Sequence, residues 1–266
     1  MSEGTVRDQG PTPDRSNVHL SYSEVEFLAS KALAVLSSGL EGVNASTPMA
    51  RLFSLTEAYL HSDEVRRHDA LARVMSKGVT PEDMIDSVVP DTARYMGELW
   101  AHDKLSFADV TIGTARLQET VRSIGKRNDM VPPDTENPAI LLIVPRIEQH
   151  TLGVFVAAEQ FRRLGVLVHL TLGNNPAEIL RLIRKHNFAL VGISASSRRT
   201  LASTRDLVKT IKSGILRVTP IVVGGPALDL EMDIKAYTGA DHATSDAREA
   251  LSLCGIETTK TVAEYS

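Results

Sequence analysis

Four short, nearly uninterrupted apolar runs in the second half of the chain constrain the fold more than any other feature of the sequence. They occupy Ala139–Val144, Val166–Leu170, Phe188–Ile193 and Pro220–Val223. Stretches with helical periodicity separate them, at Val154–Leu164, Pro176–His186 and Leu201–Ser213. Strands that are apolar on both sides must be covered on both faces, as parallel sheets are by their crossover helices. We therefore predict a doubly wound, Rossmann-like (flavodoxin-like) parallel-sheet domain. His242–Thr244 would add a short edge strand and Asp246–Leu253 a last helix.

The first half of the chain has no convincing strand. Apolar residues recur there at helical spacing between residues 22 and 126, which predicts a bundle of four or five helices, the first around Val25–Leu36. Thr80-Pro81-Glu82-Asp83 is a clear helix start, with Thr80 as the N-cap and proline at the first helical position. Pro90 is expected to kink or end that helix, and another helix follows Ser106.

Composition divides the chain into four segments. Residues 1–18 are polar, with glycine and proline, which is typical of a disordered tail. Residues 19–130 form the predicted helical bundle cap, and residues 131–137 are a proline-rich linker. Residues 138–266 hold the predicted α/β domain.

Charge and cysteine content exclude several classes of protein. The formal net charge is −4, so the broad basic surface of a stand-alone DNA-binding protein is missing, and we do not expect direct DNA contact by this chain alone. The single cysteine, Cys254, forms neither an internal disulfide nor a cysteine metal cluster, which is typical of a reducing compartment. The sequence has no secretory signal and no apolar run near the ~20 residues that span a bilayer. We expect a cytoplasmic protein with no membrane partner.

The loop after the first predicted strand, Glu148–Gly153, carries the strongest chemical signal. Ligands of doubly wound folds bind beyond the carboxyl ends of the strands, near the topological switch point. His150 can project an exposed imidazole there, and Glu148 can hydrogen-bond its second ring nitrogen, which fixes the tautomer. Gly153 permits close approach of a ligand or a helix. On these residues alone, a surface histidine in a tight turn is an equal alternative.

This loop, Glu148-Gln149-His150-Thr151-Leu152-Gly153, resembles the Asp-x-His-x-x-Gly motif of the cobalamin-binding (B12-binding) domain family. In that family the histidine replaces dimethylbenzimidazole as the lower axial ligand of cobalt, and the displaced tail inserts beside the sheet. Two further family motifs, Ser-x-Leu and Gly-Gly, correspond to Ser194-Ala195-Ser196 and Gly224-Gly225. The resemblance implies cobalamin as the cofactor and His150 as the metal ligand. It implies a site formed by Trp100, Glu148, His150, Thr151, Leu152, Gly153, Ser194, Ser196, Gly224 and Gly225.

Two departures from the family pattern concern the slot for the tail. Glu148 stands where the family has Asp, which moves the carboxylate by about one methylene, and Ser196 stands where the family has Leu. In the resemblance, Ser194 would donate a hydrogen bond to the buried heterocycle, and the two glycines would make room for the end of the tail. The alternative interpretation is that Ser194, Gly224 and Gly225 only close their strands.

The helical half supports the same resemblance. Gly97-Glu98-Leu99-Trp100, followed by Leu105–Ala108, resembles the cap of corrinoid methyltransferases and of light-sensing cobalamin regulators, which implies that Trp100 lies over the upper face of the corrin. The light-sensing regulators continue with a Glu-His pair, whose positions hold Val110 and Thr111 here. Their upper-ligand chemistry is therefore not carried over. His102 lies nearby and is interpreted as a solvated histidine at a helix end.

Ser106–Gln118, together with the His150 loop, resembles the AerR/PpaA family of phototrophic bacteria. That resemblance implies a light- or redox-responsive antirepressor, not an enzyme, whose partner is a CrtJ/PpsR-type repressor of photosynthesis genes.

The sequence leaves open whether the protein forms a homo-oligomer. Three alternatives also stay open: a corrinoid carrier in a methyltransferase system, a haem sensor with His150 as the axial iron ligand, and an α/β scaffold without a cofactor. The sequence has no P-loop, dinucleotide-binding glycine motif, zinc spacing or nucleophile elbow.

Overall fold

A computed structural model describes residues 48–128, 137–215 and 217–257 of the chain. The predicted tail (1–18), the helix predicted around Val25–Leu36 and all but the last residue of the predicted linker (131–137) lie outside the described residues. The described residues from Leu52 onward form one compact unit.

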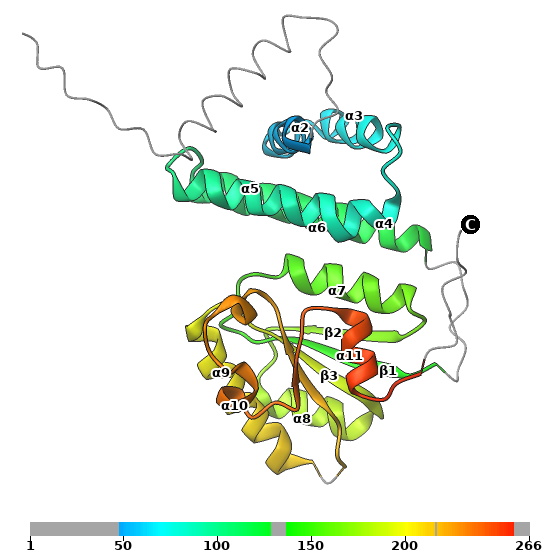
Figure 1. Cartoon of the computed structure of the whole chain (residues 1–266), viewed down its shortest axis with the longest axis vertical. Helices are drawn as coiled ribbons and strands as arrows, with labels where there is room; N and C mark the ends of the chain where they lie inside the picture. The colour runs from blue at the N-terminus through cyan, green and yellow to red at the C-terminus, as the bar shows by residue number, and fades with distance from the viewer. Residues whose placement is uncertain (1–47, 129–136, 216, 258–266) are drawn as a thin grey trace, which may run out of the picture. The chain divides into compact units, whose positions relative to one another are not determined.

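A five-stranded parallel sheet with the strand order β2-β1-β3-β4-β5 forms the centre of the second half (Figure 1). Its strands are β1 (Ala139–Val144), β2 (Leu167–Leu172), β3 (Phe188–Ser194), β4 (Ile221–Gly224) and β5 (His242–Ala243). Its helices are α7 (Leu152–Arg163), α8 (Pro176–Lys185), α9 (Arg198–Gly214), the 3-10 turn η2 (Pro226–Asp229), α10 (Ile234–Thr238) and α11 (Ala247–Leu253). The predicted doubly wound fold is confirmed, and its strand order is the flavodoxin-like one.

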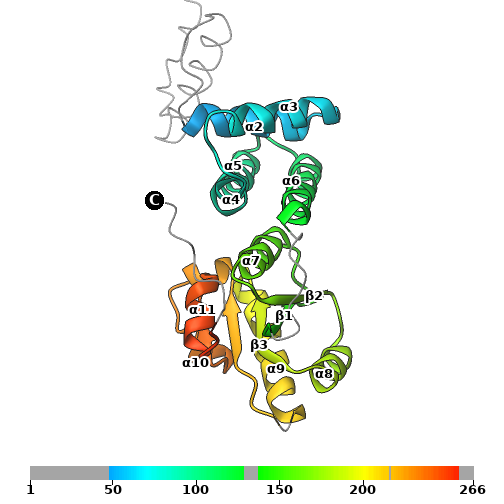
Figure 2. The ribbon, with the colours of Figure 1, turned by 90° about the vertical axis from the view of Figure 1, so that its right-hand side faces the viewer.

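The sheet separates two apolar cores, and β1 contributes to both. Ile140 and Leu142 lie in the core that includes residues of α7 and α11, whereas Leu141 and Ile143 lie in the core that includes residues of α8, α9 and α10. Figure 2 shows α7 and α8 with the sheet between them. All four side chains are buried. This two-sided burial explains why the sequence of β1 is a continuous apolar run without polar alternation.

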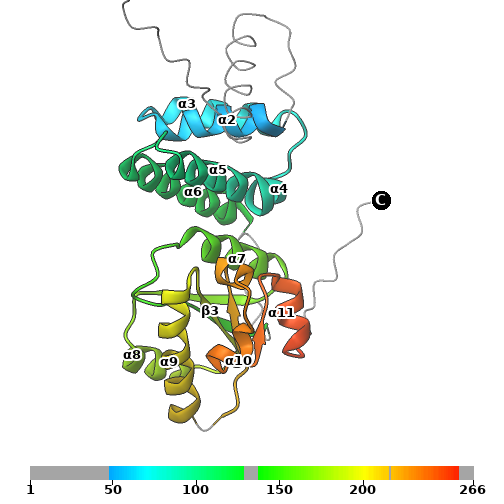
Figure 3. The same ribbon diagram turned by 60° about the vertical axis from the view of Figure 1, so that its left-hand side comes forward.

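The first half of the described chain is helical (Figure 3). It contains α2 (Pro48–Leu60), α3 (Glu64–Met75), α4 (Pro81–Asp83), the π-helical turn η1 (Met84–Val88), α5 (Val89–Ala101) and α6 (Phe107–Asn128). Thr80 caps α4 as predicted: its hydroxyl accepts the Asp83 N–H at 3.0 Å, and the Asp83 carboxylate accepts the Thr80 N–H at 3.3 Å.

Pro90 does not end the helix, so this part of the prediction is wrong. Pro90 is the second residue of α5, and the π-helical turn Met84–Val88 lies immediately before that helix. Proline has no N–H to donate to the carbonyl one turn earlier, and a widened turn accommodates that missing hydrogen bond.

The helical half packs on α7 through apolar and polar contacts. Val121 and Ile124 of α6 share one apolar core with Phe155 of α7. Arg163 of α7 forms an ion pair with Asp86 of the π-helical turn. These contacts connect α7, whose N-terminus follows the His150 loop, to the helical half.

Gly225 joins the loops that follow β3 and β4, and its backbone requires glycine. Its φ is +104°, and a Cβ atom at this position would lie 2.6 Å from the carbonyl oxygen of Ala195. Gly97, in the middle of α5, differs on both counts: its φ is ordinary, and a Cβ atom would meet no atom within 4 Å.

We predict that Gly225→Ala lowers the free energy of unfolding by about 2 kcal/mol or more, because alanine is strained at this φ and clashes with the backbone. Gly97→Ala is the control and should raise the stability by up to about 1 kcal/mol, since alanine is the better helix former. Urea unfolding measures both. Equal stability of the parent and Gly225→Ala would contradict this account of the loop.

Candidate functional site

The His150 loop lies at the switch point of the sheet. The chain continues from β1 to β2 on one side and then returns to β3 on the other side of β1. The loops after β1 and β3 therefore leave neighbouring strand ends in opposite directions, which is where doubly wound folds bind ligands. Glu148 and His150 come from the first loop, and Ser196 comes from the second.

Glu148 is the buried centre of this site. Its side chain is fully enclosed, and Oε1 accepts the His150 N–H at 2.8 Å and the Ser196 hydroxyl at 2.9 Å. Oε2 accepts the Ser196 N–H at 2.8 Å. Burial raises the pKa of Glu148, but the hydrogen bonds from His150 and Ser196 outweigh burial and bring its pKa to about 2. The carboxylate is therefore ionised at neutral pH.

His150 directs its two ring nitrogens to different surroundings. Nδ1 lies 2.9 Å from Glu148 Oε1 and 3.0 Å from the Ser196 hydroxyl. The rest of the ring projects outward, with 75% of the side chain exposed. An ionised carboxylate accepts only, so Nδ1 carries a proton, and in the neutral imidazole the lone pair lies on Nε2. The expected hydrogen bond between Glu148 and the second ring nitrogen is thus present. This hydrogen bond raises the pKa of His150, against the lowering effect of burial.

Ser196 has a role that the sequence does not disclose. The family motif has Leu at this position, whereas here both the N–H and the hydroxyl of Ser196 bond to Glu148. The Ser196 N–H also lies 2.9 Å from the hydroxyl of Thr200, in the first turn of α9. The polar residue completes the hydrogen-bonding of a buried carboxylate. Thr200 was not among the predicted site residues, and no spacing rule in the sequence identifies it.

Ser194, Gly224 and Gly225 lie where β3 and β4 end, and their contact with the cobalamin tail stays a prediction. Ser194 is half-buried and pairs with Gly224 between β3 and β4. A Cβ atom at Gly224 would lie 2.9 Å from the carbonyl oxygen of Thr244. Close backbone packing therefore accounts for both glycines, since Gly225 meets Ala195 in the same way.

Thr151, Leu152 and Gly153 begin α7 and differ in their surroundings. Thr151 donates a hydrogen bond of 2.8 Å from its hydroxyl to Oε1 of Gln118 on α6, a contact that the prediction missed although Gln118 lies within the segment used for the family resemblance. Leu152 is buried. Gly153 is exposed, and a Cβ atom there would meet nothing within 4 Å. Open surface therefore lies beside the His150 loop.

Trp100 contributes to an exposed apolar surface at the end of α5 and the start of α6. Half of its side chain is exposed, and its ring meets that of Phe107 edge-on, with 6.4 Å between the centroids. Phe107 and Ile112 are exposed as well. His102 hydrogen-bonds the carbonyl of Glu98 at 2.8 Å at the C-terminus of α5, as expected for a helix-end histidine.

Comparison with known proteins identifies the family. A family model described as the B12 binding domain matches residues 138–253. A Rhodobacter capsulatus protein, described as an uncharacterized 20.5 kDa protein in the bchF-crtJ intergenic region, is 33% identical over 178 residues, which are 65% of this chain and 91% of that protein. This chain belongs to the B12-binding domain family. The HTH-type transcriptional repressor CarH of Myxococcus xanthus is 26% identical over 212 residues, covering 75% of this chain and 68% of CarH.

A solved structure shows the same fold for the B12-binding domain and the helices before it. The monomethylamine corrinoid protein of Methanosarcina barkeri superposes with a TM-score of 0.63 at 14% identity, over 78% of this chain and 98% of that one. Among the described residues of the present chain, no helix is long and apolar enough to cross a membrane.

We predict a bell-shaped pH dependence for the stability that Glu148 contributes to this B12-binding domain without cofactor. The depressed pKa of Glu148 stabilises the fold above its ordinary value of 4.5, and this contribution is lost as the pH falls toward 2. The raised pKa of His150 stabilises the fold below its ordinary value of 6.5, and this contribution is lost as the pH rises through the folded-state pKa. The stability difference between the parent and Glu148→Gln should therefore be largest between pH 4.5 and 6.5.

Urea unfolding across the pH range measures this difference, which we expect to reach about 2 kcal/mol at its maximum. Glu57→Gln, at an exposed position on α2, is the matched control and should change the stability by less than about 0.5 kcal/mol. A Glu148→Gln difference that is flat with pH would show that the ionised pair does not form.

Proposed function

We propose that this chain binds cobalamin through His150 and acts as a cytoplasmic transcriptional regulator without catalytic activity. The observation that carries the first part is the placement of the imidazole: Nδ1 lies 2.9 Å from the buried carboxylate of Glu148, and the rest of the ring is exposed, so in the neutral imidazole Nε2 offers its lone pair. A histidine ligand binds a metal through one neutral nitrogen while its other N–H is fixed by a carboxylate or carbonyl. His150 meets both requirements before any cofactor arrives.

Two features of the described residues support a corrinoid. Open surface at Gly153 leaves room beside the His150 loop, and the exposed side chains of Trp100 and Phe107, at the end of α5 and the start of α6, offer apolar contact for a macrocycle. Bound cobalamin would supply a cobalt centre whose upper ligand responds to light or redox state. Glu148 and Ser196 would keep the imidazole oriented and its Nδ1 protonated.

The Thr151–Gln118 hydrogen bond links the His150 loop to the helical half. Thr151 is adjacent to His150, and Gln118 lies on α6. A change in the position of the loop therefore alters a contact with the helix that carries Phe107 and Ile112. Such a link supports a signalling role, because a switch needs a ligand site and a second surface that prefer the same state.

The regulatory part of the proposal is supported by two relatives. One is encoded in the bchF-crtJ intergenic region, and the other is a transcriptional repressor. We propose specifically an antirepressor whose partner is a CrtJ/PpsR-type repressor of photosynthesis genes. In this proposal His150 is the protein ligand of the cobalt.

We expect the purified chain to retain hydroxocobalamin through desalting and His150→Ala to retain at least tenfold less. His169→Ala removes another exposed histidine, on β2, and should behave like the parent. Absorption spectra measure retention. If the parent stays colourless with hydroxocobalamin but takes up haem with a Soret band, the protein is a haem sensor. If it takes up neither cofactor, it is an α/β scaffold without a cofactor.

We further expect the cobalamin-loaded chain to release a CrtJ/PpsR-type repressor from its operator in a band-shift assay, and His150→Ala to lose this effect. Retained cobalamin without any effect on the repressor would favour a corrinoid carrier, which is tested by methyl transfer to the bound cofactor.

A further inference from the structure

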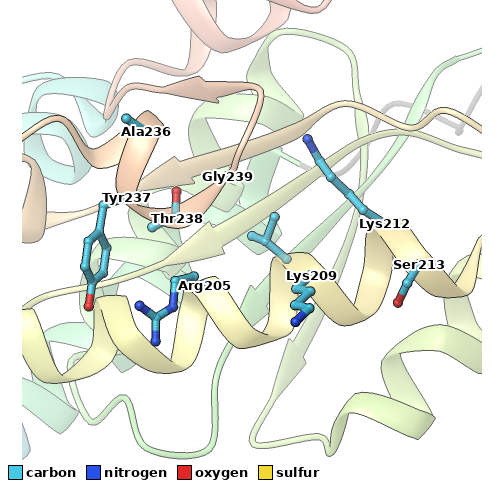
Figure 4. A pocket seen from close by; sticks show the side chains of 9 residues that line it. Arg205, Lys209, Lys212, Ser213, Ala236, Tyr237, Thr238 and Gly239 are labelled. Carbon is cyan, nitrogen blue, oxygen red and sulfur yellow. The ribbon is translucent and has the colours of Figure 1, made fainter.

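A groove between α9 and α10 lies outside the proposed cobalamin site. It is a hollow of about 460 Å³, and Figure 4 shows Arg205, Lys209 and Lys212 on successive turns of α9, with Tyr237 on α10. Part of its lining is small or apolar, as Ala236, Gly239 and buried Val208 show.

The cations of this groove form a row. The sequence of α9, RRTLASTRDLVKTIKSG, contains five basic residues and one acidic residue, in a chain whose net charge is −4. Arg205, Lys209 and Lys212 are spaced i, i+4 and i+7, so they lie on one face of the helix. With a rise of about 1.5 Å per residue, the row extends for about 10 Å.

The three cations differ in how they are held. The guanidinium of Arg205 lies 5.3 Å from the ring centroid of Tyr237, and its Nε lies 3.6 Å from the carboxylate of Asp206. Lys212 pairs with Asp241 at 2.6 Å, and this carboxylate also accepts the Ile221 N–H. Lys209 is exposed and forms no ion pair with any residue that the structure describes. All three cations are exposed; Arg205 and Lys212 each have a neighbouring carboxylate, and Lys209 has no ion pair among the described residues.

We propose that the α9–α10 groove docks an acidic segment of a protein partner. Carboxylates at i, i+4 and i+7 of a partner helix match the spacing of Arg205, Lys209 and Lys212, as in helix-in-groove recognition. The small and apolar lining of the groove admits a partner's apolar side chains. Duplex DNA fits less well, because it needs a broad basic surface, whereas this row is narrow and carries Asp206 and Asp241 beside its cations.

This inference deepens the proposed regulatory function and rests on it, since a regulator without DNA contact of its own needs a protein surface. The groove is also linked to the cofactor site by α9. This helix starts two residues after Ser196, whose N–H and hydroxyl bond to Glu148. A partner bound along α9 therefore contacts the helix whose beginning forms the support of His150.

The test uses the full chain and a fluorescein-labelled helical peptide with glutamates at i, i+4 and i+7. Fluorescence anisotropy compares the parent with the double variant Arg205→Glu/Lys209→Glu. The matched control is Arg181→Glu/Lys185→Glu on α8, since these residues have the same types and the same i, i+4 spacing and are exposed as well. A peptide with Gln in place of Glu and a random DNA duplex are the comparison ligands.

We expect the groove variant to bind the glutamate peptide at least tenfold more weakly than the parent and the α8 control to bind it like the parent. Four results would each overturn the proposal. Both variants could bind the glutamate peptide equally weakly, or the parent could bind the Gln peptide as well as the glutamate peptide. The parent could also bind neither peptide, or prefer the DNA duplex. Hydroxocobalamin retention is measured on the same variants. If the parent retains hydroxocobalamin but does not bind the peptide, the docking proposal fails. If it binds the peptide but does not retain hydroxocobalamin, the cobalamin proposal fails.

Discussion

The buried carboxylate of Glu148 connects the two loops on which the site depends. It accepts the N–H and hydroxyl of Ser196, which follows β3, and the N–H of His150, which follows β1. A buried carboxylate without these donors would be destabilising, whereas the same carboxylate with them is ionised and fixed. The loop after β1, the loop after β3 and the start of α9 are thereby held in one arrangement. That arrangement leaves Nε2 of His150 exposed.

The sheet makes this arrangement possible. β1 lies between β2 and β3 in the strand order, and its side chains are buried in both cores. Burial on both faces leaves the strand ends as the place for polar chemistry. The backbone of Gly225 packs against Ala195 beside the same loop, so the glycines support the site by close packing of the strand ends. The helical half adds a second surface, joined to the loop by Thr151 and Gln118.

Local features of the sequence were predictable, and contacts between distant segments were not. The apolar run of β1 and the cap at Thr80 depend on neighbours in the sequence, and both are confirmed. The Glu148–His150 hydrogen bond spans two residues and was expected for the same reason. Ser196 lies 48 residues from Glu148, and only the side-by-side placement of β1 and β3 brings them together. Pro90 does not end the helix, because a π-helical turn before it accommodates the missing N–H.

Short elements also escaped prediction. α10 has five residues, too few for a periodic pattern, so the groove it forms with α9 appears only in three dimensions. α9 starts at Arg198, three residues before its predicted start, because Ser197 and Thr200 form a capping box.

The most direct measurement of the central claim is electron paramagnetic resonance of the cobalt(II) form of bound cobalamin in protein labelled with ¹⁵N-histidine. A single axial nitrogen splits the cobalt lines into triplets when it is ¹⁴N and into doublets when it is ¹⁵N. Ligation by His150 predicts that labelling converts triplets into doublets and that His150→Ala restores the triplets of the vitamin's own base or removes the splitting. Triplets that are unchanged by labelling would show that dimethylbenzimidazole remains on cobalt, which would contradict the assignment of Nε2 as the lower ligand.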